Sequence, residues 1–296
     1  MTQKKLPDGS IVALITPFKE DGSVNEEKLK ELVEFHIANH TDGILVLGTT
    51  GETPTMTHEE DDVVVQTVLD TAKGRIPVIV GTGSNNSAVM RQKSLDYQNM
   101  GADALLLISP YYNKANQEGL KRHFLLTADA VDIPCILYNI PGRTGVNIPV
   151  STVAELSMHP NIQGIMEASG NISYVADIAP FLNENFKLYS GNDDMIVPVL
   201  SLGGSGVISV LANIVPEDTH ELVMSYLRGD VKKSRDLQLG YLNLIHNLFS
   251  EVNPIPVKAA MEAMGFGTGG VRLPLYEMSA PAKEKLLDAL KEKNLL

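Results

Sequence analysis

The sequence has little of what disulfide-stabilised, secreted or membrane-spanning proteins need. It holds a single cysteine, Cys135, among 296 residues, and no tryptophan. One cysteine cannot form an internal disulfide, and its apolar surroundings, IPCILY, are typical of a small buried residue. No apolar run approaches the roughly 20 residues of a membrane span, and MTQKKLPDGS at the start lacks the apolar core of a signal peptide. We therefore expect a cytoplasmic protein.

Positive charge is also scarce. The chain has 24 Lys and Arg against 36 Asp and Glu, a formal net charge of −12, and its basic residues do not cluster. Nucleic acid and membrane surfaces are therefore not expected partners. There is no HExxH motif and no cysteine pair, and neither a P-loop nor a GxGxxG follows the first apolar run. We expect no metal and no other cofactor.

What the sequence does contain is a series of eight short apolar runs. Each is rich in Ile, Val and Leu without polar alternation, as in strands buried on both faces, and each ends in small or polar residues. Segments with helical periodicity separate them, and Thr57 with Glu60 forms a capping box that opens one helix. The runs span residues 11–18, 43–48, 76–83, 103–112, 133–139, 162–170, 186–193 and 206–213.

Strand and helix thus alternate eight times within about 230 residues, which predicts an α/β fold, a (β/α)8 TIM barrel, rather than an open sheet. After this point the pattern changes to three helical segments, 231–251, 255–264 and 281–292. We expect a barrel over 1–230 and a C-terminal helical extension over 231–296 that belongs to the same domain.

A barrel of this kind carries its site where the strands end, so the residues after each run are the candidates. GTTGE at 48–52 has two hydroxyls between glycines, which suits a small carboxylate but is also typical of a tight turn. Tyr112 and Tyr138 each end a predicted strand, where they can relay a proton or simply pack. Arg143, in a loop, is either a carboxylate clamp or a surface residue. Met166 ends the run that continues as EASG, an unexpected place for an inert thioether.

Five motifs taken together resemble the dihydrodipicolinate synthase family of the N-acetylneuraminate lyase superfamily. The likeness runs from ITPF to VRLPL, over essentially the whole chain. The motifs are GTTGET at 48–53, PYYN at 110–113, YNIPGRTG at 138–145, GVISV at 206–210 and NPIPVK at 253–258.

The resemblance implies a lyase of lysine and diaminopimelate biosynthesis that condenses pyruvate with aspartate semialdehyde through a Schiff base on a lysine of the sixth strand. It assigns the pyruvate carboxylate to Thr50 and a backbone contact with pyruvate to Ile208. Thr49, Tyr112 and Tyr138 would relay protons, with Tyr138 as the principal acid and base. It places Arg143 on the semialdehyde carboxylate. Tyr112 would come from a neighbouring subunit, which implies a homotetramer built as a dimer of dimers.

One position departs from the family pattern. The sixth-strand motif G-I-K-E-A-[ST]-G reads GIMEASG here, so Met166 stands where the Schiff-base lysine would be. Methionine matches a lysine stem in length but has no amine. Two interpretations stay open: a deliberately disabled synthase, or a natural homologue that lacks aldolase activity and binds a keto acid or regulates a partner. Another pyruvate-dependent aldolase, such as N-acetylneuraminate lyase, is the alternative activity.

Overall fold

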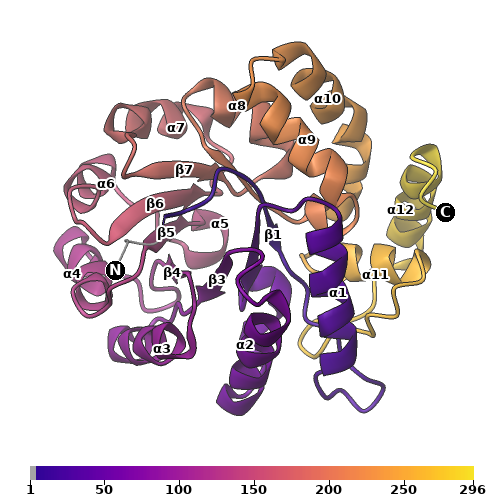
Figure 1. Cartoon of the computed structure of the whole chain (residues 1–296), viewed down its shortest axis with the longest axis horizontal. Coiled ribbons are helices and arrows are strands. Elements are labelled where there is room, and N and C mark those ends of the chain that lie inside the picture. The colour runs from indigo at the N-terminus through magenta and orange to yellow at the C-terminus, as the bar shows by residue number, and fades with distance from the viewer. Residues whose placement is uncertain (1–4) are drawn as a thin grey trace.

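Eight parallel strands close into a barrel in the order β1 to β8, with β8 hydrogen-bonded to β1 (Figure 1). The structure is a computed structural model that describes residues 5–296. It confirms the predicted (β/α)8 architecture. The strands are β1 (Gly9–Ala13), β2 (Gly43–Val46), β3 (Val78–Gly81), β4 (Ala104–Ile108), β5 (Cys135–Asn139), β6 (Ile162–Glu167), β7 (Lys187–Ser190) and β8 (Gly206–Ser209).

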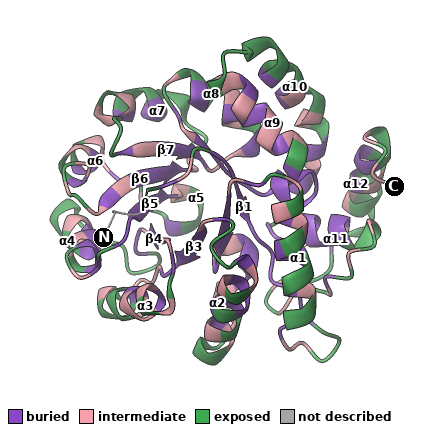
Figure 2. Cartoon of the chain, in the orientation of Figure 1, coloured by how far each residue is buried: buried purple, intermediate pink, exposed green. Residues whose placement is uncertain are grey.

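Both faces of the strands are buried, which explains why the runs read as continuously apolar. Side chains such as Ile11, Leu45 and Ile208 fill the barrel interior, whereas alternate residues such as Val12 and Ile44 face the surrounding helices. Figure 2 shows the strands and the inner faces of the helices as buried, with the exposed residues on the outer ring. The barrel is thus a packed core, and a site is expected beyond it, at the carboxyl ends of the strands.

The helices of the outer ring follow the predicted alternation. Their bounds are α1 (Glu26–Ala38), α2 (His58–Ala72), α3 (Ser87–Met100), α4 (Gln117–Ala128), α5 (Pro141–Thr144), α6 (Val150–Leu156), α7 (Ile172–Ile178), α8 (Ile196–Ser201) and α9 (Pro216–Leu227). The predicted capping box is confirmed, because Thr57 and Glu60 exchange hydrogen bonds at the start of α2. Among residues 5–296, no helix is long and apolar enough to cross a membrane.

Three helices continue the chain after the barrel: α10 (Val231–Leu248), α11 (Ile255–Ala263) and α12 (Ala280–Glu292). The first was predicted to reach residue 251 but ends at Leu248, because the chain turns there towards the barrel mouth. Phe266, just after α11, packs edge-on against Phe35 of α1 with ring centroids 5.1 Å apart. In Figure 1, α11 lies beside α1, and α12 lies farther out at the edge of the molecule. The extension therefore contacts the first βα unit of the barrel.

Candidate active site

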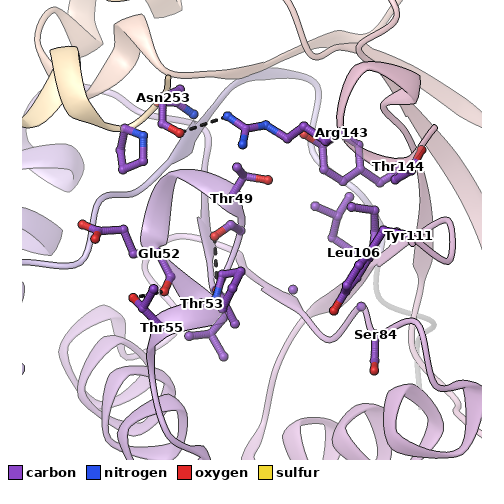
Figure 3. A pocket seen from close by; sticks show the side chains of 18 of the residues that line it. Thr49, Glu52, Thr53, Thr55, Ser84, Leu106, Tyr111, Arg143, Thr144 and Asn253 are labelled. Atoms are coloured by element: carbon purple, nitrogen blue, oxygen red, sulfur yellow. Dashed lines mark hydrogen bonds between the residues drawn. The ribbon is translucent and has the colours of Figure 1, made fainter. Parts of the chain in front are cut away.

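A cavity of about 640 Å³ opens at the carboxyl ends of the strands. Six of the seven predicted site residues line it: Thr49, Thr50, Tyr138, Arg143, Met166 and Ile208. A second cavity of about 440 Å³ adjoins it and shares Thr49, Tyr138 and Arg143 (Figure 3). These residues come from β2, β5, β6 and β8 or the loops after them, so the fold gathers positions that are up to 159 residues apart in sequence.

The loop after β2 presents Thr49 and Thr50 through a tightly constrained backbone. The two threonines lie in a single 3-10 turn, Thr49–Gly51, and Glu52 follows in the left-handed region at φ 57°. Gly81 of β3 lies so close to this loop that a Cβ there would be 2.2 Å from the Leu47 carbonyl oxygen. Only glycine allows this approach at position 81. The loop is therefore held against the barrel wall.

A buried ion pair fixes the far side of the same loop. The Lys258 ammonium lies 2.8 Å from a Glu52 carboxylate oxygen and also donates to the carbonyls of Thr16 and Gly270. The other Glu52 oxygen accepts from the backbone N–H of Arg272 at 2.9 Å. Burial lowers the pKa of Lys258, and the Glu52 carboxylate opposes that shift. Lys258 thus ties α11 to the threonine loop, a role that the sequence reading missed.

Tyr138 and Met166 stand side by side on the inner wall. They are register partners on β5 and β6, and both belong to the cluster that fills the barrel interior. Burial raises the pKa of the Tyr138 phenol, while a hydrogen bond with Thr49 and the charge of Arg143 act in the opposite direction. A phenol with a raised pKa stays protonated at neutral pH and can pass its proton to a ligand.

Strand β6 ends one residue later than the sequence reading placed it. Met166 was taken as the last strand residue, but the ladder includes Glu167. Since side chains alternate along a strand, Met166 points inward and Glu167 points outward. Glu167 accepts hydrogen bonds from the Asn139 side chain and from the Ser169 N–H, each at 2.6 Å. Of these two neighbouring residues, Met166 lines the cavity and Glu167 does not.

Space for the Met166 side chain depends on a glycine that directly follows strand β7. A Cβ added to Gly191 would lie 3.0 Å from Met166 Cε and 2.6 Å from the Ala168 Cβ. Any larger residue at position 191 would therefore push on the tip of the methionine. Met166 is 5% exposed and packs within the cluster that fills the barrel interior.

Arg143 reaches across the cavity mouth from the short helix α5. Its guanidinium donates to the backbone carbonyl of Asn253 at 3.0 Å, as the dashed line in Figure 3 shows. The Asn253 side chain donates in turn to the Thr50 hydroxyl at 2.9 Å. Asn253 lines both cavities, and the sequence reading assigned it no role.

The end of β8, which carries Ile208, is held by a buried carboxylate. Asp193 accepts from the Ser209 hydroxyl and from the N–H groups of Val210 and Leu211 at 2.5 to 3.0 Å. Burial raises the pKa of Asp193 to about 6, although these hydrogen bonds oppose the shift. The backbone that lines the cavity at Ile208 is thereby fixed from outside the barrel.

Tyr112 is the one predicted site residue that does not line the cavity. It was predicted to end a strand, but β4 ends at Ile108, and Pro110 cannot donate to a sheet ladder. Tyr112 has a φ of 68° and is 93% exposed. Within one chain it projects away from the site.

Comparison with known proteins identifies the family. A model of the dihydrodipicolinate synthetase family matches residues 6–293. The chain belongs to this family. It is 53% identical over 289 residues to the 4-hydroxy-tetrahydrodipicolinate synthase of Thermoanaerobacter sp. (strain X514), covering 97% of each chain. Against the synthase of Caldicellulosiruptor saccharolyticus the identity is 54% over 282 residues, or 95% of each.

Solved structures agree over the same length. The dihydrodipicolinate synthase of Aquifex aeolicus superimposes with a TM-score of 0.95 at 45% identity, covering 97% of this chain and 98% of that one. The corresponding protein of Thermotoga maritima gives a TM-score of 0.96 at 38% identity, covering 99% and 100%. The family barrel, including its C-terminal helices, is thus present throughout the described residues.

Proposed function

We propose that the cavity is a 4-hydroxy-tetrahydrodipicolinate synthase site, built to condense pyruvate with aspartate semialdehyde, in which Met166 occupies the Schiff-base lysine position. The observation that carries the proposal is the convergence of six predicted residues on one cavity with Met166 on its inner wall. The names of relatives more than 50% identical over nearly the whole chain support the reaction.

The roles are those that the family resemblance implies, and the positions of the groups are compatible with them. Thr50 would donate to the pyruvate carboxylate, and the backbone at Ile208 would contact pyruvate on the same cavity wall. Tyr138 with Thr49 forms the proton relay beside position 166, completed by Tyr112 from a neighbouring subunit. Arg143 at the mouth suits the semialdehyde carboxylate, because its planar guanidinium can donate two parallel hydrogen bonds.

The reaction requires an amine at position 166. In the covalent route a lysine nitrogen adds to the keto carbon, water leaves, and the imine loses a methyl proton to give an enamine. The enamine carbon then bonds to the aldehyde carbon, whose oxygen takes up a proton. A thioether has no N–H to lose, so it cannot form the imine. We therefore propose that this chain binds keto acids without forming the adduct and is a catalytically disabled synthase.

Met166 itself favours one second candidate function. A chain that keeps the carboxylate-binding groups and lacks the amine is also what a natural keto-acid-binding or regulatory homologue would be. The two candidates differ in whether the rest of the site can still catalyse. Restoring the amine separates them, since only a disabled synthase regains activity from that change alone.

The test is Met166→Lys. Met158→Lys is the matched control, because Met158 is 77% exposed and lines neither cavity. We expect condensation of pyruvate with aspartate semialdehyde, and a borohydride-trapped pyruvate adduct on residue 166, only in Met166→Lys. The unaltered chain and Met158→Lys should give neither. A folded but inactive Met166→Lys protein would refute the disabled-synthase proposal. A pyruvate adduct on the unaltered chain would show that the adduct forms without an amine at position 166.

A further inference from the structure

Asn253 joins the two groups proposed to bind carboxylates, although it lies outside the barrel sequence. It follows α10 in the segment Phe249–Asn253, which lines the larger cavity. Its side-chain N–H donates to the Thr50 hydroxyl, and its backbone carbonyl accepts from Arg143. Thr50 is 203 positions away in sequence and Arg143 is 110 away. One residue of the C-terminal extension therefore contacts both ends of the proposed substrate site.

The direction of the hydrogen bond to Thr50 matters. A hydroxyl has one proton to donate and can accept in two directions. Because Asn253 uses its N–H on the Thr50 oxygen, the threonine proton remains available for another acceptor. Thr50 is 3% exposed and lines the cavity, so the cavity is where that acceptor would lie. A carboxylate in the cavity could therefore accept a hydrogen bond from the Thr50 hydroxyl.

The contact with Arg143 has a second effect. The residue as a whole is exposed on α5, and a long side chain in solvent samples many rotamers. The 3.0 Å hydrogen bond to the Asn253 carbonyl holds the guanidinium across the mouth. That bond uses one of its N–H groups, and the others remain available to a ligand.

We infer that Asn253 is a positioning residue that fixes Thr50 as a donor and Arg143 as a clamp, so that the C-terminal extension sets the carboxylate specificity of the barrel site. This inference rests on the proposed function. It predicts that pyruvate binding needs the side-chain amide of Asn253, and not only a side chain of that size.

The decisive comparison is between Asn253→Ala and Asn253→Asp, with Asn243→Ala as the control. Asn243 is an exposed asparagine on α10 that bonds Glu292, away from both cavities. Pyruvate binding to each protein is measured by saturation-transfer NMR from pH 4 to 8, alongside thermal unfolding. We expect Asn253→Ala to weaken binding about tenfold, because Thr50 loses the side-chain hydrogen bond that directs its proton to the ligand, while the backbone carbonyl that holds Arg143 remains. Asn243→Ala should bind like the unaltered chain.

Asn253→Asp gives a readout that a purely structural role would not produce. An aspartate offers Thr50 an acceptor and places a negative charge beside the bound carboxylate. Affinity should therefore fall further as the pH rises through the aspartate titration, whereas Asn253→Ala should show no such added pH dependence. A loss of stability alone would shift both melting temperatures without this difference.

A double variant tests whether Asn253 acts through Thr50. If it does, Thr50→Val with Asn253→Ala should bind pyruvate no more weakly than Thr50→Val alone, because coupled residues are not additive. The same set in the Met166→Lys background should raise the KM for pyruvate more than it lowers kcat.

The outcomes separate the two proposals. Independent, additive losses, or unchanged pyruvate binding in Asn253→Ala, would overturn the role of Asn253 and leave the proposed function intact. If the unaltered chain does not bind millimolar pyruvate and Met166→Lys shows no turnover, the proposed function fails, and the inference fails with it.

Discussion

Replacing Lys258 by methionine should destabilise the protein and loosen the threonine loop. The side chains of Lys258 and Glu52 are 2% and 0% exposed, so neither charge has water to replace its partner. Methionine keeps the length of the lysine stem, and the change therefore removes the charge without opening a large cavity. It leaves the Glu52 carboxylate with the Arg272 backbone N–H on one oxygen and no cation on the other.

The expected cost is about 3 kcal/mol or more, because removing one partner of a buried ion pair typically costs 3–5 kcal/mol. The carbonyls of Thr16 and Gly270 also lose their donor, which adds to the loss. Adding Glu52→Gln removes the uncompensated charge and should recover part of this energy. Lys291→Met is the matched control, since its pair with Asp288 is more than 60% exposed and worth less than about 1 kcal/mol.

Urea unfolding with linear extrapolation gives the free energies, and pyruvate binding by NMR reports on the loop. We expect Lys258→Met to lose both stability and affinity, and Lys291→Met to lose neither. A loss of less than about 1 kcal/mol in Lys258→Met would show that the buried pair does not anchor the loop. Lost stability with full pyruvate affinity would show that the pair stabilises the fold without holding the threonine loop.

The remaining predictions concern pH and assembly. Burial raises the pKa of Asp193 from 3.8 to about 6, so the folded protein binds this proton more tightly than the unfolded chain does. Its contribution to stability is therefore present at about pH 4 and lost as the pH rises through 6, by about 3 kcal/mol in all. Asp193→Asn should lack this decline, and an unchanged difference between wild-type and variant unfolding energies at pH 4.5 and 7 would contradict the raised pKa. For assembly, the family resemblance implies a tetramer in which Tyr112, 93% exposed within one chain, reaches a neighbouring site. We therefore expect light scattering to report a tetramer; a monomer would remove Tyr112 from the proposed relay.

The barrel was predictable because its physics is local. A strand buried on both faces must be apolar at successive positions, and an outer helix must repeat its apolar residues every three or four positions. Each signal is contained in about ten residues, so eight strands could be counted from the sequence. The ends of elements were less predictable. Strand β4 stops at Ile108, and the signal for that end was Pro110, which lies inside the predicted run 103–112 and cannot donate to a sheet ladder.

The candidate site divides in the same way. Thr49, Tyr138 and Met166 follow their strands directly, so barrel geometry alone predicts that they converge. Asn253 and Lys258 act through partners 203 and 206 positions earlier, and neither residue carries a local signal for those contacts. The proline-flanked NPIPVK segment was recognised as a motif, but its asparagine and lysine gain a physical role only once the extension packs over the mouth.

Under the proposed function, this division explains how the chain could lack the amine and keep the rest of the site. The threonine loop is held by Glu52 and Lys258, and the clamp by the Asn253 carbonyl. None of these contacts involves residue 166, whose side chain packs in the apolar barrel interior, approaches Gly191 and borders the cavity. Methionine occupies the volume of a lysine stem, so we expect either side chain at position 166 to leave Thr50 and Arg143 in place. Under the proposed function, ligand recognition and covalent chemistry belong to separate residues of one cavity, and a single substitution at position 166 would remove the second without the first.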